Sequence, residues 1–346
     1  MSNVGFIQKS STTITHSSAM ASGIMRKSPS FNFKVTRTSL RASLVALMTV
    51  IFLALPLAFA DDSTQQVFQT PQAAASALVT AAKSDDLAAL SSILGPDGRQ
   101  IISSGDPVAD NNAREEFVRR YEQMHRLAYD DEGMVVLYIG ADNWPTPIPL
   151  VRKDRGWIFA TAAGKEELLY RRIGRNELFT IDVLRNLLDA EHEYAASRNQ
   201  FAQKILSTPG QQNGLYWKTA DGEPESPIGP LVADATVEGY RRGDNITPLP
   251  FHGYYYKVLT RQGRNAPGGA MNYIVHGQMT KGFAFLAYPA EYRSSGVTTF
   301  MVNQDGIIVQ KDLSPETVKQ ASELAEFNPD GTWDQVLDDA TEHDTN

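Results

Sequence analysis

One segment constrains this chain more than any other: the uncharged, largely apolar stretch from Ala42 to Ala60. The stretch ends in Ala58-Phe59-Ala60, and the acidic Asp61 follows directly. Basic residues precede the stretch, and no aspartate or glutamate occurs before Asp61. A basic flank, an apolar core and a small-x-small end are the parts of a secretory signal peptide. We therefore expect residues 1–60 to be a Sec-type signal peptide that is cleaved after Ala60 and directs the protein to the periplasm.

Two other interpretations of this leader stay open. The apolar stretch could just span a bilayer, so an uncleaved membrane anchor is the second interpretation. The Ser- and Thr-rich residues before it also suit an organellar transit peptide, although such peptides have no long apolar core. Pro56 and the Ala58-Phe59-Ala60 end favour cleavage. A lipid anchor at the cleavage point would need a cysteine, and the chain has none.

Charge and cysteine content restrict what the rest of the chain can do. The whole chain has a net charge of −8, and its leader holds six basic and no acidic residues, which leaves −14 for the remainder. So acidic a protein repels nucleic acid phosphates and anionic lipids, and we expect neither as a partner. The lack of cysteine excludes disulfides, thiolate nucleophiles and thiolate metal sites. We expect a fold held together by packing, without a cofactor, and without a membrane span after cleavage.

Residues 61–163 are expected to form an N-terminal α+β module. Thr70 and Pro71 suit the N-cap and first position of a helix, and Asp85 or Asp86 can cap a second one. The expected elements are helices over 71–82, 86–94 and 113–127 and strands over 134–139, 148–151 and 157–161. Helices followed by an antiparallel sheet indicate the α+β class.

Residues 164–327 are expected to form a second module, in which a long helix precedes an antiparallel sheet. The helix should cover 165–200, interrupted or kinked at Gly174, with an apolar stripe at Leu178, Ile181, Leu184, Leu188 and Ala195. Proline and glycine predict surface loop over 207–250, apart from a short helix near 231–240. The later expected elements are strands over 253–260, 272–276, 282–288, 298–302 and 307–311 and a helix over 314–327. The acidic residues 328–346 are expected to be a mobile tail.

Several strings along the chain form a distinctive set. They are Leu94-Gly95-Pro96-Asp97-Gly98, Ser103-Ser104-Gly105-Asp106-Pro107, Arg171-Arg172-Ile173-Gly174-Arg175-Asn176-Glu177, Ser207-Thr208-Pro209-Gly210, Gly214-Leu215-Tyr216-Trp217, Phe251-His252-Gly253-Tyr254-Tyr255-Tyr256 and Val302-Asn303-Gln304-Asp305-Gly306. With them, residues 68–327 resemble a bacterial exported family designated domain of unknown function 2950. The resemblance implies an exported envelope protein and brings no activity with it.

Two weaker likenesses concern the fold alone. Residues 67–161, with a hairpin that ends in Gly156-Trp157-Ile158-Phe159, resemble the cone-shaped fold of nuclear-transport-factor-like domains. The long helix and the strands over 254–311 resemble the globular half of a type IV pilin, although this module lacks the hydrophobic assembly helix with which pilins begin. A fold likeness does not transfer function.

Arg171, Arg172 and Arg175 are the concentrated basic spot of an otherwise acidic region. Such a cluster can bind a carboxylate or phosphate through bidentate contacts, or it can form ion pairs with the protein's own acids. Helical spacing places Arg171 and Arg175 on one face and turns Arg172 away by about 100°. We expect a small anionic ligand or an envelope protein to bind here, with at most two of the three arginines in one site.

Asp189, His192 and Glu193 are a weaker candidate, because their helical spacing brings two acids and an imidazole onto one surface. Such a set could supply two metal ligands or an oriented base, or it could be a boundary histidine beside solvated acids. His125 is interpreted as a histidine near a helix C-terminus, where this residue is favoured. His252 and His276, expected in the strand region, are interpreted as packing against tyrosines. Trp144, in the loop that follows Gly140, could line a pocket mouth or fill the core.

No set of residues in the sequence assembles a catalytic group, since a Gly-x-Ser-x-Gly elbow and a phosphate-binding loop are both missing. We therefore expect a non-catalytic binding or interaction module of the cell envelope. Two alternatives are an accessory protein of envelope assembly or secretion that uses a pilin-like sheet, and a small-molecule hydrolase or isomerase with a pocket in the N-terminal module.

Overall fold

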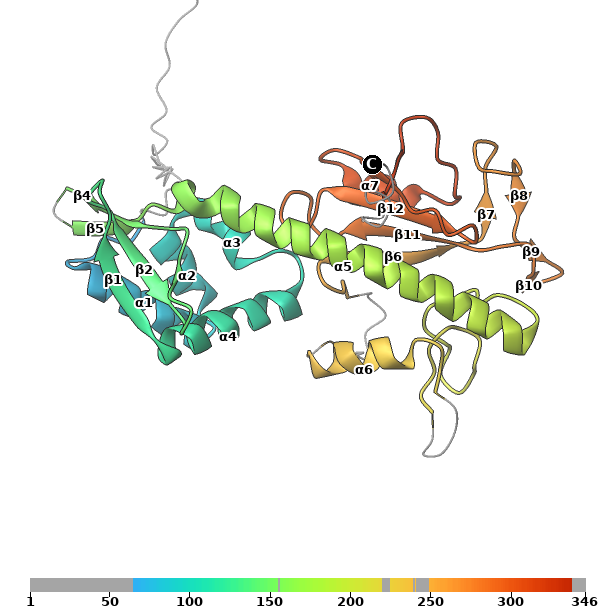
Figure 1. Ribbon diagram of the computed structural model, residues 1–346, viewed down its shortest axis with the longest axis horizontal. Helices are drawn as coiled ribbons and strands as arrows, with labels where there is room; N and C mark the ends of the chain where they lie inside the picture. Colours follow the sequence, from blue (N-terminus) through green and yellow to red (C-terminus); the bar gives the residue numbers. More distant parts are fainter. Residues whose placement is uncertain (1–64, 155, 220–224, 239, 241–248, 338–346) are drawn as a thin grey trace, which may run out of the picture. The chain divides into compact units, whose positions relative to one another are not determined.

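The fold is described from a computed structural model for residues 65–154, 156–219, 225–238, 240 and 249–337 (Figure 1). The expected signal peptide lies outside these residues and stays a prediction. Among the described residues, no helix is both long enough and apolar enough to cross a membrane. The structure has the mixed helix and antiparallel-sheet content that the sequence predicts. The two finer likenesses, to nuclear-transport-factor-like domains and to pilins, stay predictions.

The first part of the chain packs short helices against an antiparallel sheet of order β1-β2-β4-β5, with β3 paired to β2. Its elements are α1 (Pro71–Lys83), α2 (Leu87–Leu94), a 3-10 turn (Pro96–Gly98), α3 (Arg99–Ile102), α4 (Pro107–Gln123), β1 (His125–Tyr129), β2 (Val135–Ile139), β3 (Trp144–Pro145), β4 (Leu150–Lys153) and β5 (Gly156–Phe159). Alternate residues of β2 are buried, which is the pattern of a strand with one face on a core. That core lies between the sheet and α1 and α2.

Two of the three helix starts follow the sequence prediction, and the third does not. The side chains of Thr70 and Asp86 accept backbone N–H groups three residues on, as N-caps do. The third helix was expected over 113–127 but runs from Pro107 to Gln123, because Asp106 caps it and Pro107 occupies its first position. His125 therefore lies in β1 and not at a helix end; its ring stacks on Tyr121 at a centroid distance of 3.8 Å.

Helix α5 (Thr161–Arg198) has 38 residues and is continuous through Gly174, where an interruption was expected. Among the described residues, and leaving aside the adjoining helix backbone, no atom lies within 4 Å of the position that a Cβ atom of Gly174 would take, so packing does not require its missing side chain. The expected module boundary at Gly164 falls inside this helix. Gly164 is needed there, because a Cβ atom would overlap the carbonyl oxygen of Pro147. Leu178, placed in the apolar stripe by the sequence, is 68% exposed.

The second part of the chain packs α5 against a sheet of order β14-β13-β12-β11-β6, all antiparallel. The remaining elements are α6 (Gly229–Val237), β6 (Tyr254–Leu259), β7 (Arg261–Gln262), β8 (Met271–Asn272), β9 (Ile274–Val275), β10 (Gln278–Met279), β11 (Ala284–Pro289), β12 (Thr298–Asn303), β13 (Val309–Asp312), α7 (Thr317–Glu323) and β14 (Asp334–Gln335). Their core includes α5 residues Val183, Leu184 and Leu187. The turn at 303–306 joins β12 and β13 as an antiparallel pair, as predicted.

Three expectations for this part need correction. The strand expected over 272–276 is split, because β8 pairs with β7 while β9 pairs with β10, and the buried Tyr273 stands between them. The helix expected to reach residue 327 ends at Glu323, which leaves Phe327 free to form a bridge with Gln262. The mobile tail was expected from residue 328, but Asp334 and Gln335 form β14, which pairs with β13. Residues 338–346 lie outside the described part.

Candidate functional site

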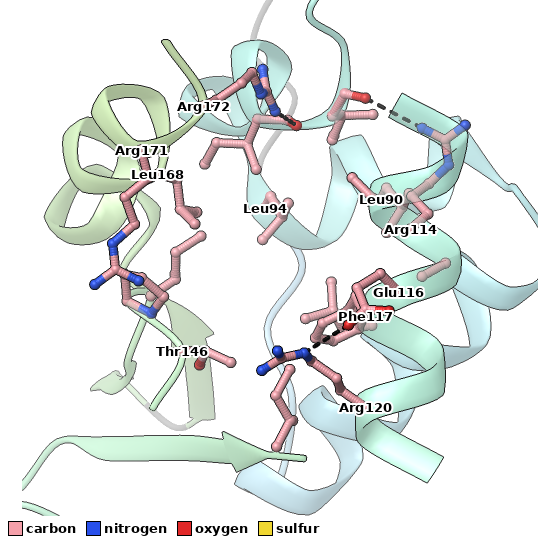
Figure 2. A pocket seen from close by; sticks show the side chains of 18 of the residues that line it. Leu90, Leu94, Arg114, Glu116, Phe117, Arg120, Thr146, Leu168, Arg171 and Arg172 are labelled. Atoms are coloured by element: carbon pink, nitrogen blue, oxygen red, sulfur yellow. Dashed lines mark hydrogen bonds and ion pairs between the residues drawn. The ribbon is translucent and has the colours of Figure 1, made fainter. Parts of the chain in front are cut away.

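A cavity lies in the first part of the chain and extends to the N-terminal half of α5 (Figure 2). Its volume is about 600 Å³, which is within the range of small-molecule sites. Most of its wall is hydrocarbon from α1, α2, α3, α4, β2, β5 and α5 and from the segment that precedes β4. The apolar lining residues are Leu78, Ala82, Leu90, Leu94, Ile101, Ile102, Ala113, Phe117, Ile139, Trp144, Pro147, Ile148, Phe159 and Leu168.

Two helices supply nearly all the charged residues of this wall. From α4, Asp110, Arg114, Phe117 and Arg120 recur at spacings of three and four, so one face of the helix is turned to the cavity. Asp106 fixes where this helix begins, because its carboxylate accepts N–H groups of the first turn. From α5 come Leu168 and the three arginines of the expected cluster. Figure 2 shows the two helices on opposite sides of the cavity.

The α4 arginines are compensated by carboxylates. Arg120 pairs with Glu116 at 2.8 Å and with Asp142 at 3.1 Å. The Nε atom of Arg114 lies 2.7 Å from Oδ1 of Asp85. The carboxylates of these pairs are exposed, so the pairs contribute little to stability, but they do neutralise the cations at this wall.

Arg172 is used by the protein's own backbone. Its two terminal nitrogens donate to the carbonyl oxygens of Gln100 at 2.7 Å and Ile101 at 2.6 Å, both in α3. Burial lowers the pKa of this guanidinium, while the nearby Asp110 opposes that change. Arg172 lines the cavity along with Arg171 and Arg175, but two of its N–H donors are used by these carbonyls.

Arg171 and Arg175 are the exposed arginines of the cluster. Arg171 pairs with Glu167 one turn earlier, and its guanidinium lies 5.6 Å from the ring centroid of Trp144. Trp144 is half-buried; it lines the cavity and also packs against the small core of Tyr121, Leu137 and Ile139. Arg175 has no hydrogen bond or ion pair with any residue that the structure describes.

Asp110 is the buried acid of the cavity wall. Both of its carboxylate oxygens accept the backbone N–H of Ser104, at 3.1 and 2.9 Å. Burial raises the pKa of Asp110, and the hydrogen bonds from Ser104 partly offset that effect. The carboxyl group is thus held by the chain beside it, which suits a structural part of the wall.

The structure does not bring Asp189, His192 and Glu193 into contact with one another. All three are exposed, and the ring of His192 packs against Phe283 at a centroid distance of 5.7 Å. Within the described ranges, no group of three metal-binding side chains is close enough to hold an ion. The ionisable residue that matters in this turn is Glu191, which is fully buried and was not singled out from the sequence. Its position three and four residues after Leu188 and Leu187 is the signal that could have found it.

A second polar cluster, also missed from the sequence, centres on the fully buried Asp106. Besides capping α4, its Oδ2 atom accepts the hydroxyl of Tyr240 and the N–H of Gly253, both at 2.8 Å. The ring of His252 packs on Phe179 at 3.8 Å. Because four donors saturate the Asp106 carboxylate, this cluster joins distant segments of the chain and leaves no acceptor for a ligand.

Together, these features define an α+β protein with an apolar cavity that is bordered by arginines. A sequence model of the family described as "Protein of unknown function (DUF2950)" matches residues 65–336, and the chain belongs to that family. The family predicted from the sequence strings is therefore confirmed. Neither a search of curated proteins nor one of solved structures found a significant match.

Proposed function

We propose that this protein is an exported, non-catalytic binding protein whose cavity takes a small molecule with a large apolar part. The carrying observation is the cavity of about 600 Å³ with its wall of leucine, isoleucine and aromatic side chains. Removing apolar ligand surface from water is favourable by roughly 25 cal/mol per Å², so such a wall selects hydrocarbon.

The polar lining residues support binding over the hydrolase alternative. Those that the structure describes include no histidine, serine or tyrosine, and Thr146 supplies a hydroxyl without a base beside it. Asp110 is held by the Ser104 backbone, and Glu116 pairs with Arg120. None of these side chains forms a nucleophile with an adjacent base, which acyl transfer and hydrolysis commonly require.

Export is the second part of this proposal and rests on the leader. The basic flank, the uncharged stretch and the Ala58-Phe59-Ala60 end support cleavage after Ala60 and release into the periplasm. A ligand-binding protein of the envelope would meet apolar small molecules there.

The binding function is tested with N-phenyl-1-naphthylamine, a neutral apolar dye that fluoresces in hydrocarbon surroundings. We expect protein purified after expression of the full-length chain to bind the dye saturably. Leu168→Gln places an amide in the wall and should weaken binding by about fivefold or more. Leu178→Gln is the matched control, because Leu178 lies on the same helix but is exposed. Absence of saturable binding, or equal loss in both variants, would refute the proposal.

A further inference from the structure

Not every cation that lines the cavity is paired, and the unpaired one in the described part of the chain is Arg175. The lining includes the arginines 114, 120, 171, 172 and 175 and the acids Asp110, Glu116 and Asp142. Arg114 and Arg120 have carboxylate partners, Arg171 shares Glu167, and Arg172 donates to two backbone carbonyls. Among the lining cations in the described part of the chain, Arg175 alone has neither an ion pair nor a hydrogen bond.

The neighbours of Arg175 add further positive charge around it. Arg171 lies one helical turn before it on the same face. The charge of Arg175 also lowers the pKa of the guanidinium of Arg172, as repulsion between like charges does. Arginine cannot relieve that repulsion by losing its proton. An anion bound between Arg171 and Arg175 would relieve it.

The anion that fits has one charge and an apolar body. Glu167 already pairs with Arg171, and the carboxylates of Asp110 and Glu291 both act on Arg172, so Arg175 is the arginine left for a ligand, and a second negative charge would be repelled by these carboxylates. A dianionic head such as a phosphate monoester would meet more carboxylate repulsion than a carboxylate would. On α5, which also holds these arginines, Leu168 begins the hydrocarbon wall that continues to Leu90, Leu94 and Phe117 (Figure 2).

We propose that the ligand is an alkyl carboxylate, an amphiphile with one negative head and a hydrocarbon chain. Its carboxylate accepts hydrogen bonds from Arg175 and Arg171 at the cavity edge, and its chain lies among Leu90, Leu94, Phe117 and Leu168. This inference rests on the proposed binding function and specifies its ligand class. Trp144, beneath the guanidinium of Arg171, closes the same edge.

The test compares four probes with one chain length, namely decanoate, 1-decanol, decylammonium and decyl phosphate, by displacement of N-phenyl-1-naphthylamine. We expect decanoate to bind about tenfold more tightly than 1-decanol, because a hydrogen bond to a charged group contributes at least that factor. Arg175→Gln should weaken decanoate binding by about tenfold and change the affinity for 1-decanol by far less. Arg175→Lys should keep most of the preference, because it keeps the charge.

Arg175 is a safe residue to change, since it is exposed and has no partner to lose, whereas replacing Arg172 would leave two carbonyls without donors. Arg152→Gln is the matched control: this arginine is exposed on β4 and does not line the cavity. It should leave every affinity unchanged.

Each contrary outcome has its own meaning. Equal binding of decanoate and 1-decanol would overturn the carboxylate assignment and leave the binding function standing. Tighter binding of decylammonium or of decyl phosphate would overturn the single-anion assignment. Failure of the dye and of all four probes to bind would overturn the binding function itself.

Discussion

Glu191→Gln should make the stability of the protein less sensitive to a rise in pH between 4.5 and about 8, for a reason that the structure makes explicit. Glu191 is fully buried on α5. Its Oε2 atom accepts the N–H of Ala202 at 2.7 Å, while Oε1 has no hydrogen-bond partner within the described residues. Burial raises the pKa of Glu191 from 4.5 to about 8, and the bond from Ala202 only partly opposes this. A neutral carboxyl or amide is therefore tolerated at this position, and a carboxylate is not.

The sign of the pH dependence follows from proton binding. Between pH 4.5 and pH 8 the folded protein holds a proton on Glu191 that the unfolded chain has released. The free energy of unfolding therefore falls as pH rises through this window, and the loss is complete above pH 8. At about 1.4 kcal/mol per pKa unit, raising the pH from about 5.5 to about 7.5 should cost roughly 3 kcal/mol. Glu191→Gln has no proton to lose and avoids this cost.

The assay is urea unfolding of the wild type and the variant at both pH values, followed by tryptophan fluorescence. The informative quantity is the stability of the variant minus that of the wild type, since groups common to both cancel. This difference should grow in favour of the variant by roughly 3 kcal/mol between the two pH values. Glu193→Gln, at an exposed glutamate two residues on, is the control and should give a constant difference. A constant difference for Glu191→Gln as well would refute the reasoning.

Three further predictions concern single positions. Gly164→Ala should destabilise the protein by roughly 2 kcal/mol or more, because its Cβ would overlap Pro147. Gly174→Ala, where a Cβ meets no neighbour among the described residues, should stabilise it by up to about 1 kcal/mol. Equal effects of the two variants in thermal unfolding would contradict this. Asp106→Ala should lower the free energy of unfolding in urea by roughly 3 kcal/mol, since four donors lose their acceptor. The simple N-cap variant Asp86→Ala should lower it by about 1 kcal/mol. Similar losses in the two variants would mean that the Asp106 cluster adds nothing beyond a cap. Intact-mass measurement of the periplasmic fraction should give a chain that begins at Asp61, and a retained leader with membrane pelleting would restore the anchor interpretation.

The sequence predicts helix starts correctly where the residues that set them are close together in the chain. Thr70 before Pro71 and Asp86 before an apolar run place two helix starts, because a cap and its donors lie within three residues. The same chemistry is present at Asp106 and Pro107, but the prediction began the helix only at residue 113. Here the local signal was present in the sequence and was not used.

The site could be predicted only in part, because most of it depends on residues far apart in the chain. The spacing of Arg171 and Arg175 predicts that they share a face, and both line the cavity. The carbonyls that occupy Arg172 lie more than 70 residues earlier, and nothing near Arg172 in the sequence indicates them. The apolar wall likewise requires several helices and strands to meet, which residue patterns within one element do not specify.

Helix α5 contributes side chains both to the cavity wall and to the core of the second part of the chain. Its first half presents Arg171 and Arg175 to the cavity, and its second half presents Val183 and Leu187 to the other core. Each residue along a helix adds about 1.5 Å of length and 100° of rotation. Deleting one residue between Arg175 and Val183 would therefore turn one set of side chains away from its target, whereas inserting seven, close to two whole turns, would nearly restore the phase. The rotation of the helix between Arg175 and Val183 thus constrains how many residues this interval can have, even though they include an exposed leucine.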